Sequence, residues 1–142
     1  MTKRKIGIDY GEKRIGVAVS DLLGITAKGC DVLYWNGLDV DLTVRNLAKI
    51  CEKYDPDTIV FGLPSRTDGK ISETSEKARH MAKELENFMN VKVVFEDEKY
   101  TSVLAGRILR ETKKKTDRKS GETDMMAAEI ILSSYLEKLR KL

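Results

Sequence analysis

The N-terminal stretch from Lys5 to Asp21 constrains the fold more than any other part of this chain. Apolar residues alternate with others on both sides of a short glycine-containing turn, which predicts a β-hairpin. One face of this hairpin is expected to be apolar, with the side chains of Ile6, Ile8, Tyr10, Ile15, Val17 and Val19. The other face is expected to surround the carboxylate of Asp9 with small residues, namely Gly7, Gly16, Ala18 and Ser20. An ionised carboxylate in a sheet is costly unless a metal ion or a cationic group compensates it, so Asp9 is the first candidate functional residue.

The bulk composition is typical of a globular protein. A chain of 142 residues with 41% hydrophobic and 35% charged residues predicts one domain spanning residues 1–142. Apolar runs stay well short of the ~18 residues that a membrane span needs, and the N-terminus lacks a signal-like apolar segment. We therefore expect a cytoplasmic protein with no membrane partner. Cys30 and Cys51 lie far apart in the sequence and are expected to be free thiols.

The positive charge is concentrated in one segment. The net charge is only +3, but residues 107–120 contain seven basic and two acidic residues, with Lys113, Lys114 and Lys115 at their centre. Basic residues also gather near both ends of the chain. Such clusters suit a polyanionic partner, nucleic acid above all. The alternative is that the segment is simply a solvated loop.

The rest of the sequence predicts strands that alternate with helices. A third strand is expected within residues 25–35, and a helix capped by Asp39 or Asp41 should follow and stop at Pro56. Further elements are expected as a strand at 58–63, a long helix ending near Met89, a strand at 91–95, a short helix at 102–110 and a last helix opening at 121–123. The spacing of apolar residues in the long helix predicts that Phe88 lies on its apolar face. This order predicts an α/β fold with a mixed five-stranded sheet, three antiparallel strands followed by parallel strands, and helices on both faces.

Two further groups of acids stand out. Asp124 lies four residues before Ala128 and seven before Ile131, which places it on the apolar stripe of the last helix. An equally good explanation is an acid favoured by the dipole at the helix start. Glu96, Asp97 and Glu98 follow one another at the carboxyl end of a buried strand, where ligand sites of α/β sheets lie. Strand alternation sends Asp97 and Glu98 to opposite sides, so one of them is expected to enter a site.

Asp9, Glu98 and Asp124 together suggest a cation site. Hard divalent cations prefer oxygen ligands and retain positions for water and phosphate. Two such ions can activate a water molecule and stabilise the leaving oxygen of a phosphodiester. The sequence offers no Ser- or Cys-centred nucleophile pattern, and its single histidine, His80, lies off the apolar helix face. Metal-assisted hydrolysis is therefore the chemistry that these residues favour.

Four ordered blocks of the sequence resemble the YqgF/RuvX family, a branch of the RNase H-like fold. The hairpin matches its opening pattern, in which a glycine precedes Asp-x-Gly-x-x-Arg and Ser-Asp ends the second strand. The other three blocks follow in the family's order: 60–64 with Asp68-Gly69, 97–102, and 124–132. The resemblance covers almost the whole chain. It implies an RNase H-like nuclease that acts as a Holliday junction resolvase or in processing of the 16S rRNA precursor.

The resemblance also implies roles for individual residues. Its metal-binding catalytic acids would be Asp9, Glu98 and Asp124, holding Mg²⁺ or Mn²⁺, with two ions expected. The residues flanking the substrate would be Arg14, Arg66, Lys99 and Thr101, and the basic residues Lys113, Lys114 and Lys115 are expected to add substrate contacts. Lys99 and Ser102 depart from the family, which usually has Arg and Thr there. Lysine keeps the charge but loses the bidentate fork of arginine.

Several functions remain open at this stage. The leading hypothesis is an endonuclease that processes the 5′ end of the 16S rRNA precursor, with ribosomal particles as further partners. The main alternative is a Holliday junction resolvase that acts on branched DNA and would need a symmetric dimer, although the sequence does not distinguish a monomer from a homodimer. A non-catalytic nucleic-acid-binding module is a third hypothesis, and retention of all three acids argues against it. An actin-like sugar kinase would need a second domain, for which this chain is too short.

Overall fold

The strands in the described part of the chain form one mixed five-stranded sheet, as predicted. The computed structural model describes residues 3–63, 73–97 and 120–141. Neighbouring strands follow the order β3-β2-β1-β4-β5, with β1 antiparallel to β2, β2 antiparallel to β3, and β1, β4 and β5 parallel to one another. Their bounds are β1 Lys5–Asp9, β2 Arg14–Ser20, β3 Ala27–Tyr34, β4 Thr58–Leu63 and β5 Lys92–Asp97.

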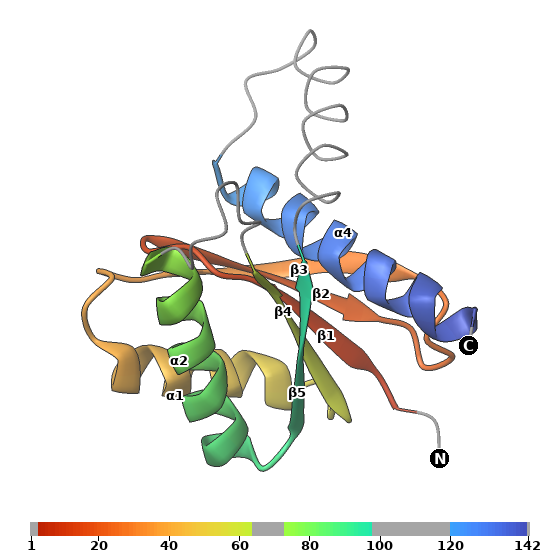
Figure 1. Cartoon of the computed structure of the whole chain (residues 1–142), viewed down its shortest axis with the longest axis horizontal. Helices are drawn as coiled ribbons and strands as arrows, with labels where there is room; N and C mark the ends of the chain where they lie inside the picture. The colour runs from red at the N-terminus through yellow and green to blue at the C-terminus, as the bar shows by residue number, and fades with distance from the viewer. Residues whose placement is uncertain (1–2, 64–72, 98–119, 142) are drawn as a thin grey trace, which may run out of the picture.

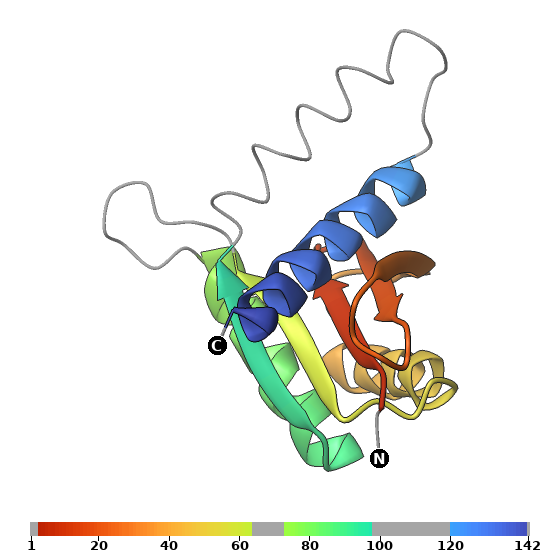
Figure 2. The same cartoon turned by 90° about the vertical axis from the view of Figure 1, so that its right-hand side faces the viewer.

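Helices cover both faces of this sheet. Helices α1 (Val40–Glu52) and α2 (Glu73–Met89) pack side by side on one face. Helix α4 (Ser120–Arg140) runs across the other face over β1, β2 and β3, as Figures 1 and 2 show. The short helix expected at residues 102–110 lies outside the described residues. None of the helices in the described ranges is long and apolar enough to cross a membrane.

The start of α1 follows its predicted capping chemistry, but its end does not. Asp39 is the N-cap, and its side chain accepts a hydrogen bond from the amide of Leu42 at 3.1 Å. The helix ends at Glu52, before the predicted stop at Pro56. Asp55 adopts a positive φ of 46°, so the chain has already turned away from helical geometry when it reaches the proline.

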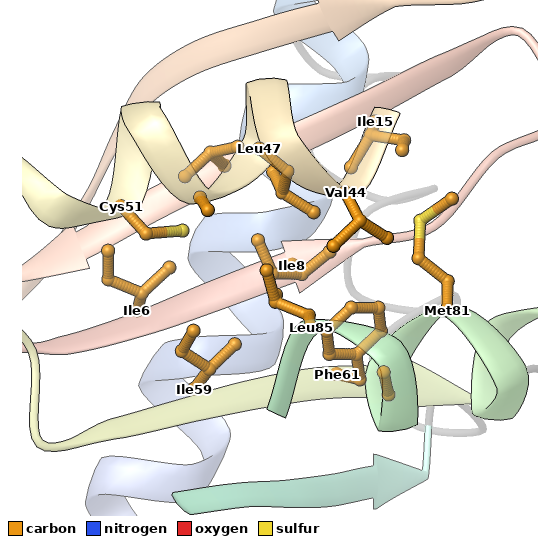
Figure 3. Close-up of a cluster of buried hydrophobic side chains, with 13 residues drawn as sticks. Ile6, Ile8, Ile15, Val44, Leu47, Cys51, Ile59, Phe61, Met81 and Leu85 are labelled. Atoms are coloured by element: carbon orange, nitrogen blue, oxygen red, sulfur yellow. The ribbon is translucent and has the colours of Figure 1, made fainter. Parts of the chain in front are cut away.

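The larger core lies between the sheet and the helices α1 and α2. Figure 3 shows the side chains of both helices meeting the apolar face of β1, β2 and β4. Phe61 is fully buried at the centre of this layer, and burial of a side chain of this size contributes about 2–3 kcal/mol. Burial also raises the pKa of Cys51 to about 12, which keeps this core thiol protonated. Phe88 was expected on the buried stripe of α2, but its position is 55% exposed.

The opposite face of the hairpin is built for close approach of α4. A Cβ atom at Gly7 would lie 2.7 Å from the Cβ of Leu132, and one at Gly29 would lie 2.9 Å from that of Met125. Larger residues on these strands would push the helix off the sheet. Ala18 belongs to the small core under α4, as the sequence suggested. Ser20 has a different role, because its hydroxyl accepts a hydrogen bond from the amide of Lys5 at 2.8 Å.

Candidate active site

The candidate site lies where the end of β1 meets the N-terminal part of α4. Asp9 is the last residue of β1, and the antiparallel register pairs it with Gly16 of β2. A Cβ atom on Gly16 would overlap the main-chain oxygen of Asp124, so α4 touches the strand at this position. Two of the three predicted acids, far apart in the sequence, are therefore brought to neighbouring positions on the same face of the sheet.

Arg14 completes the described part of this site. It begins β2 across the turn from Asp9, and its Nε donates a hydrogen bond to Oδ2 of Asp124 at 2.7 Å. The Asp124 side chain is only 19% exposed, whereas that of Arg14 is 39% exposed. Asp124 thus faces the sheet rather than solvent, which is the inward orientation that the helix pattern suggested. Its contact with Arg14 is charge-assisted and short, so it fixes the carboxylate at the sheet surface.

The described residues fit part of a divalent-cation site. Among them, no group of three or more His, Cys, Asp and Glu side chains could hold a metal ion. Asp9 and Asp124 nevertheless supply the hard oxygen donors that Mg²⁺ and Mn²⁺ prefer. The guanidinium of Arg14 forms an ion pair with Asp124, so a positive charge is already bound beside this carboxylate. A complete site would need at least one further oxygen donor from outside the described ranges.

The remaining predicted site residues lie outside the described residues. They are Glu98 among the acids and Arg66, Lys99, Thr101, Lys113, Lys114 and Lys115 among the substrate-binding residues. Glu98 follows directly after β5 in the sequence. Its role as the third acid stays a prediction, and so do the substrate roles of the basic residues.

A second acid of the 96–98 triplet has a role that the sequence analysis missed. Glu96 is buried in β5, where its carboxylate accepts hydrogen bonds from Ser134 Oγ at 2.7 Å and Lys138 Nζ at 2.9 Å. Both partners belong to α4, so this cluster ties β5 to the helix that carries Asp124. Strand alternation could have predicted this burial. Glu96 lies on the same face of β5 as Val94, and Val94 packs against the core under α4.

The basic residues at the two ends of the described chain have local partners. Lys3 and Lys5 form ion pairs with Asp55 and Asp57 at 3.4 and 3.2 Å. At the other end, Lys138 binds Glu96 and Lys141 lies 3.4 Å from Glu137. These contacts give the terminal lysines structural roles and weaken the expectation that the termini serve a polyanion. The central basic segment remains the stronger candidate for that role.

The sequence comparisons give a consistent picture over nearly the full length. Residues 3–138 match the model of the RuvX family, described as Holliday junction resolvase. A protein of Clostridium botulinum (strain Eklund 17B / Type B) named "Putative pre-16S rRNA nuclease" is 38% identical over 138 residues, covering 97% of this chain and 99% of the relative. A protein of the same name from strain Hall of that species is 36% identical with the same coverage.

The comparisons with solved structures support the fold. RuvC of T. thermophilus in complex with a Holliday junction substrate superposes with a TM-score of 0.66 at 13% identity, covering 98% of this chain and 96% of that chain. The fowlpox virus Holliday junction resolvase gives a TM-score of 0.58 at 17% identity, with coverage of 95% and 99%. The predicted RNase H-like architecture is thereby confirmed.

Proposed function

Because the chain belongs to the RuvX family of nucleases, we propose that it is a metal-dependent endonuclease that processes the 5′ end of the 16S rRNA precursor. The observation that carries this proposal is the convergence of Asp9 and Asp124 over Gly16. A binding module without catalysis has no need for two acids at neighbouring positions on one face of the sheet, whereas a cation site does. We place this activity in the cytoplasm, in one nuclease domain spanning residues 1–142.

The acids would act as the ligands of the catalytic cations. Asp9, Asp124 and Glu98 would hold Mg²⁺ or Mn²⁺, with two ions proposed. Such ions, when bound, lower the pKa of water and stabilise the leaving oxygen of a phosphodiester. The chain's own contribution is to present rigid oxygen donors, one from a strand end and one from a helix packed directly on that strand.

Arg14 has two tasks in this proposal. Its Nε holds the Asp124 carboxylate at 2.7 Å and offsets its charge. The rest of the guanidinium is partly exposed and can meet a substrate phosphate beside the acids. Arg66, Lys99 and Thr101 would flank the substrate, and Lys113, Lys114 and Lys115 would bind its phosphate backbone.

The description of the RuvX family as Holliday junction resolvase favours a second candidate function. A Holliday junction resolvase would use the same chemistry on branched DNA, and it would act as a homodimer that places one site on each of two opposing strands. We prefer the rRNA activity because the relatives at 36–38% identity are named as pre-16S rRNA nucleases, and the similarity to this chain covers 99% of their length. Ribosomal particles are then the natural setting of the substrate.

One experiment separates these functions. The purified full chain is incubated with Mn²⁺ and either an RNA spanning the 5′ end of the 16S precursor or a four-way DNA junction. We expect cleavage of the RNA near the mature end and at most slow cleavage of the junction. Faster, symmetric cleavage of the junction would favour the resolvase, and no cleavage of either substrate would overturn the nuclease proposal.

A further inference from the structure

A cavity of about 340 Å³ lies beside the turn that joins β1 to β2. It is lined by residues of this turn, of the β3–α1 connection and of α2, namely Tyr10, Trp35, Gly37, Val40, Glu73, Glu76, Lys77 and His80. Tyr10 directly follows Asp9, and the same turn ends at Arg14. A residue that lines the cavity is therefore adjacent in sequence to an acid of the candidate active site. Tyr10 packs on the face of the sheet that α1 and α2 cover, which is opposite to the face that α4 covers.

Two aromatic rings, those of Tyr10 and Trp35, form part of the cavity wall. The rings of Tyr10 and Trp35 meet edge to face, with centroids 6.0 Å apart and an interplanar angle of 69°. Trp35 is fixed in place, because its Nε1 donates a hydrogen bond to the carbonyl of Gly11 at 2.8 Å and its amide donates one to the carbonyl of Lys13 at 3.0 Å. A planar, neutral ring that enters this cavity can stack on preoriented aromatic surface.

The polar wall of the cavity selects against phosphate. Lys77 is held between Glu12 at 3.2 Å and Glu73 at 3.5 Å, so its charge is already compensated. Within the described ranges, the carboxylate of Glu76 has no ion-pair or hydrogen-bond partner. The cavity thus carries excess negative charge, which repels a phosphate. A carboxylate instead accepts hydrogen bonds from amino groups.

We propose that this cavity binds one unpaired nucleobase of the substrate next to the cleaved phosphate, with a preference for bases that carry an exocyclic amino group. The inference rests on the proposed nuclease function. A strand that passes over the β1–β2 turn would present its phosphate to Asp9 and Asp124 on one side and its base to Tyr10 and Trp35 on the other. Glu76 accepts from the amino group of adenine, guanine or cytosine, whereas uracil has no exocyclic amino group and offers only its ring N3–H as a donor.

Trp35 is the only tryptophan of the chain, so its fluorescence reports on this cavity directly. The full chain is titrated with short oligoadenylate, oligocytidylate or oligouridylate, with Ca²⁺ replacing Mg²⁺ to suppress cleavage. Total binding is followed in parallel by the anisotropy of a dye on the oligonucleotide. We expect saturable quenching of Trp35 by oligoadenylate and oligocytidylate, at the concentrations at which the anisotropy rises, and weaker quenching by oligouridylate.

The variant Glu76→Gln tests the polar wall. Loss of the charged acceptor should weaken binding of oligoadenylate and oligocytidylate by about five-fold, as expected for one lost charge-assisted hydrogen bond, and should weaken binding of oligouridylate less. Simple electrostatics predicts the opposite, because removal of a negative charge should tighten the binding of every polyanion. Glu84→Gln is the matched control, since it makes the same change on the same helix, in the lining of a different cavity.

The outcomes separate the two proposals. Binding by anisotropy without a change in Trp35 emission, or tighter binding of all three oligonucleotides by Glu76→Gln, overturns the base pocket and leaves the nuclease function intact. Absence of binding for all oligonucleotides overturns this inference together with the proposed function. Base-dependent quenching that Glu76→Gln weakens and Glu84→Gln does not supports the pocket.

Discussion

At the scale of single residues, the absence of a side chain at Gly16 decides whether the site can form. The two acids come from different elements, and the main chain of α4 rests on this glycine at the level of Asp124. Gly7 and Gly29 provide the same close approach at two further points of the helix. The geometry of the proposed site depends as much on residues without side chains as on the carboxylates.

Gly16→Ala tests this dependence. The new Cβ would overlap the main-chain oxygen of Asp124, and a helix backbone cannot yield as a flexible side chain does. We expect a loss of about 1–3 kcal/mol in the free energy of unfolding, which is typical of overpacking, together with loss of cleavage. Chemical denaturation and a cleavage assay measure the two effects.

Gly24→Ala is the control for this substitution. Gly24 has a φ of 71°, so alanine is strained there by about 1 kcal/mol, but its Cβ would meet only Leu136 at an ordinary 3.9 Å. This variant should be less stable yet still cleave. If both variants kept full activity, close packing of α4 on Gly16 would not be needed for the site.

At the scale of elements, α4 is held at its two halves by different polar contacts. Arg14 binds its N-terminal part through Asp124, and Glu96 binds its C-terminal part through Ser134 and Lys138. In the second group of contacts the side chain of Glu96 is buried, whereas that of Lys138 is 66% exposed. Together these contacts set the register of the helix on the sheet, and hence the position of Asp124 relative to Asp9.

Lys138→Met should destabilise the protein, because it leaves the buried carboxylate of Glu96 with Ser134 as its remaining partner in the described structure. The expected loss is about 1–3 kcal/mol, reduced from the value for a fully buried pair by the exposure of Lys138. The double variant Glu96→Gln with Lys138→Met should recover part of this loss. Denaturant unfolding of the two single variants and the double variant gives the coupling energy, and strict additivity would show that the ion pair contributes nothing.

The turn between β2 and β3 should make stability depend on pH. Asp21 Oδ1 accepts hydrogen bonds from the amides of Thr26 at 3.1 Å and Ile25 at 2.7 Å, which lower the pKa of this carboxyl below its ordinary value of 3.8. The stabilisation is therefore present above the unfolded-state pKa and is lost as the pH falls through the folded-state pKa. Asp21→Asn should be less stable than the wild type at neutral pH, and the difference should shrink in acid. A difference that stays constant across an acid titration of unfolding would contradict this role.

At the scale of the whole molecule, the elements and their order could be predicted from the sequence because their periodicities are strong. The hairpin faces follow strict alternation from Ile6 to Ser20, and the described structure keeps them. Contacts between distant elements were harder to foresee. The Glu96–Lys138 pair joins residues 42 positions apart, and the cavity at Trp35 depends on how β3 approaches the β1–β2 turn. No local pattern encodes such distances.

The site itself could be predicted only in part. Asp9 was identifiable as an acid among small residues of a strand, and Asp124 from its helix stripe. The sequence alone left two explanations for Asp124, and its contact with Arg14 decides for the inward one. The prediction for Phe88 was wrong. Helical spacing placed this residue on the apolar face of α2, but in the structure its side chain is exposed.

We propose that Asp9 and Asp124 hold the catalytic cations of a nuclease. The most direct measurement compares Mn²⁺ binding and cleavage of the 16S precursor RNA for the wild type, Asp9→Asn and the control Asp41→Asn, which neutralises an exposed acid in the first turn of α1. We expect that Asp9→Asn folds normally, binds Mn²⁺ at least ten-fold more weakly and reduces cleavage by about 10²-fold or more, whereas Asp41→Asn behaves as the wild type. Cleavage at the wild-type rate by a folded Asp9→Asn protein would contradict the proposed role of Asp9.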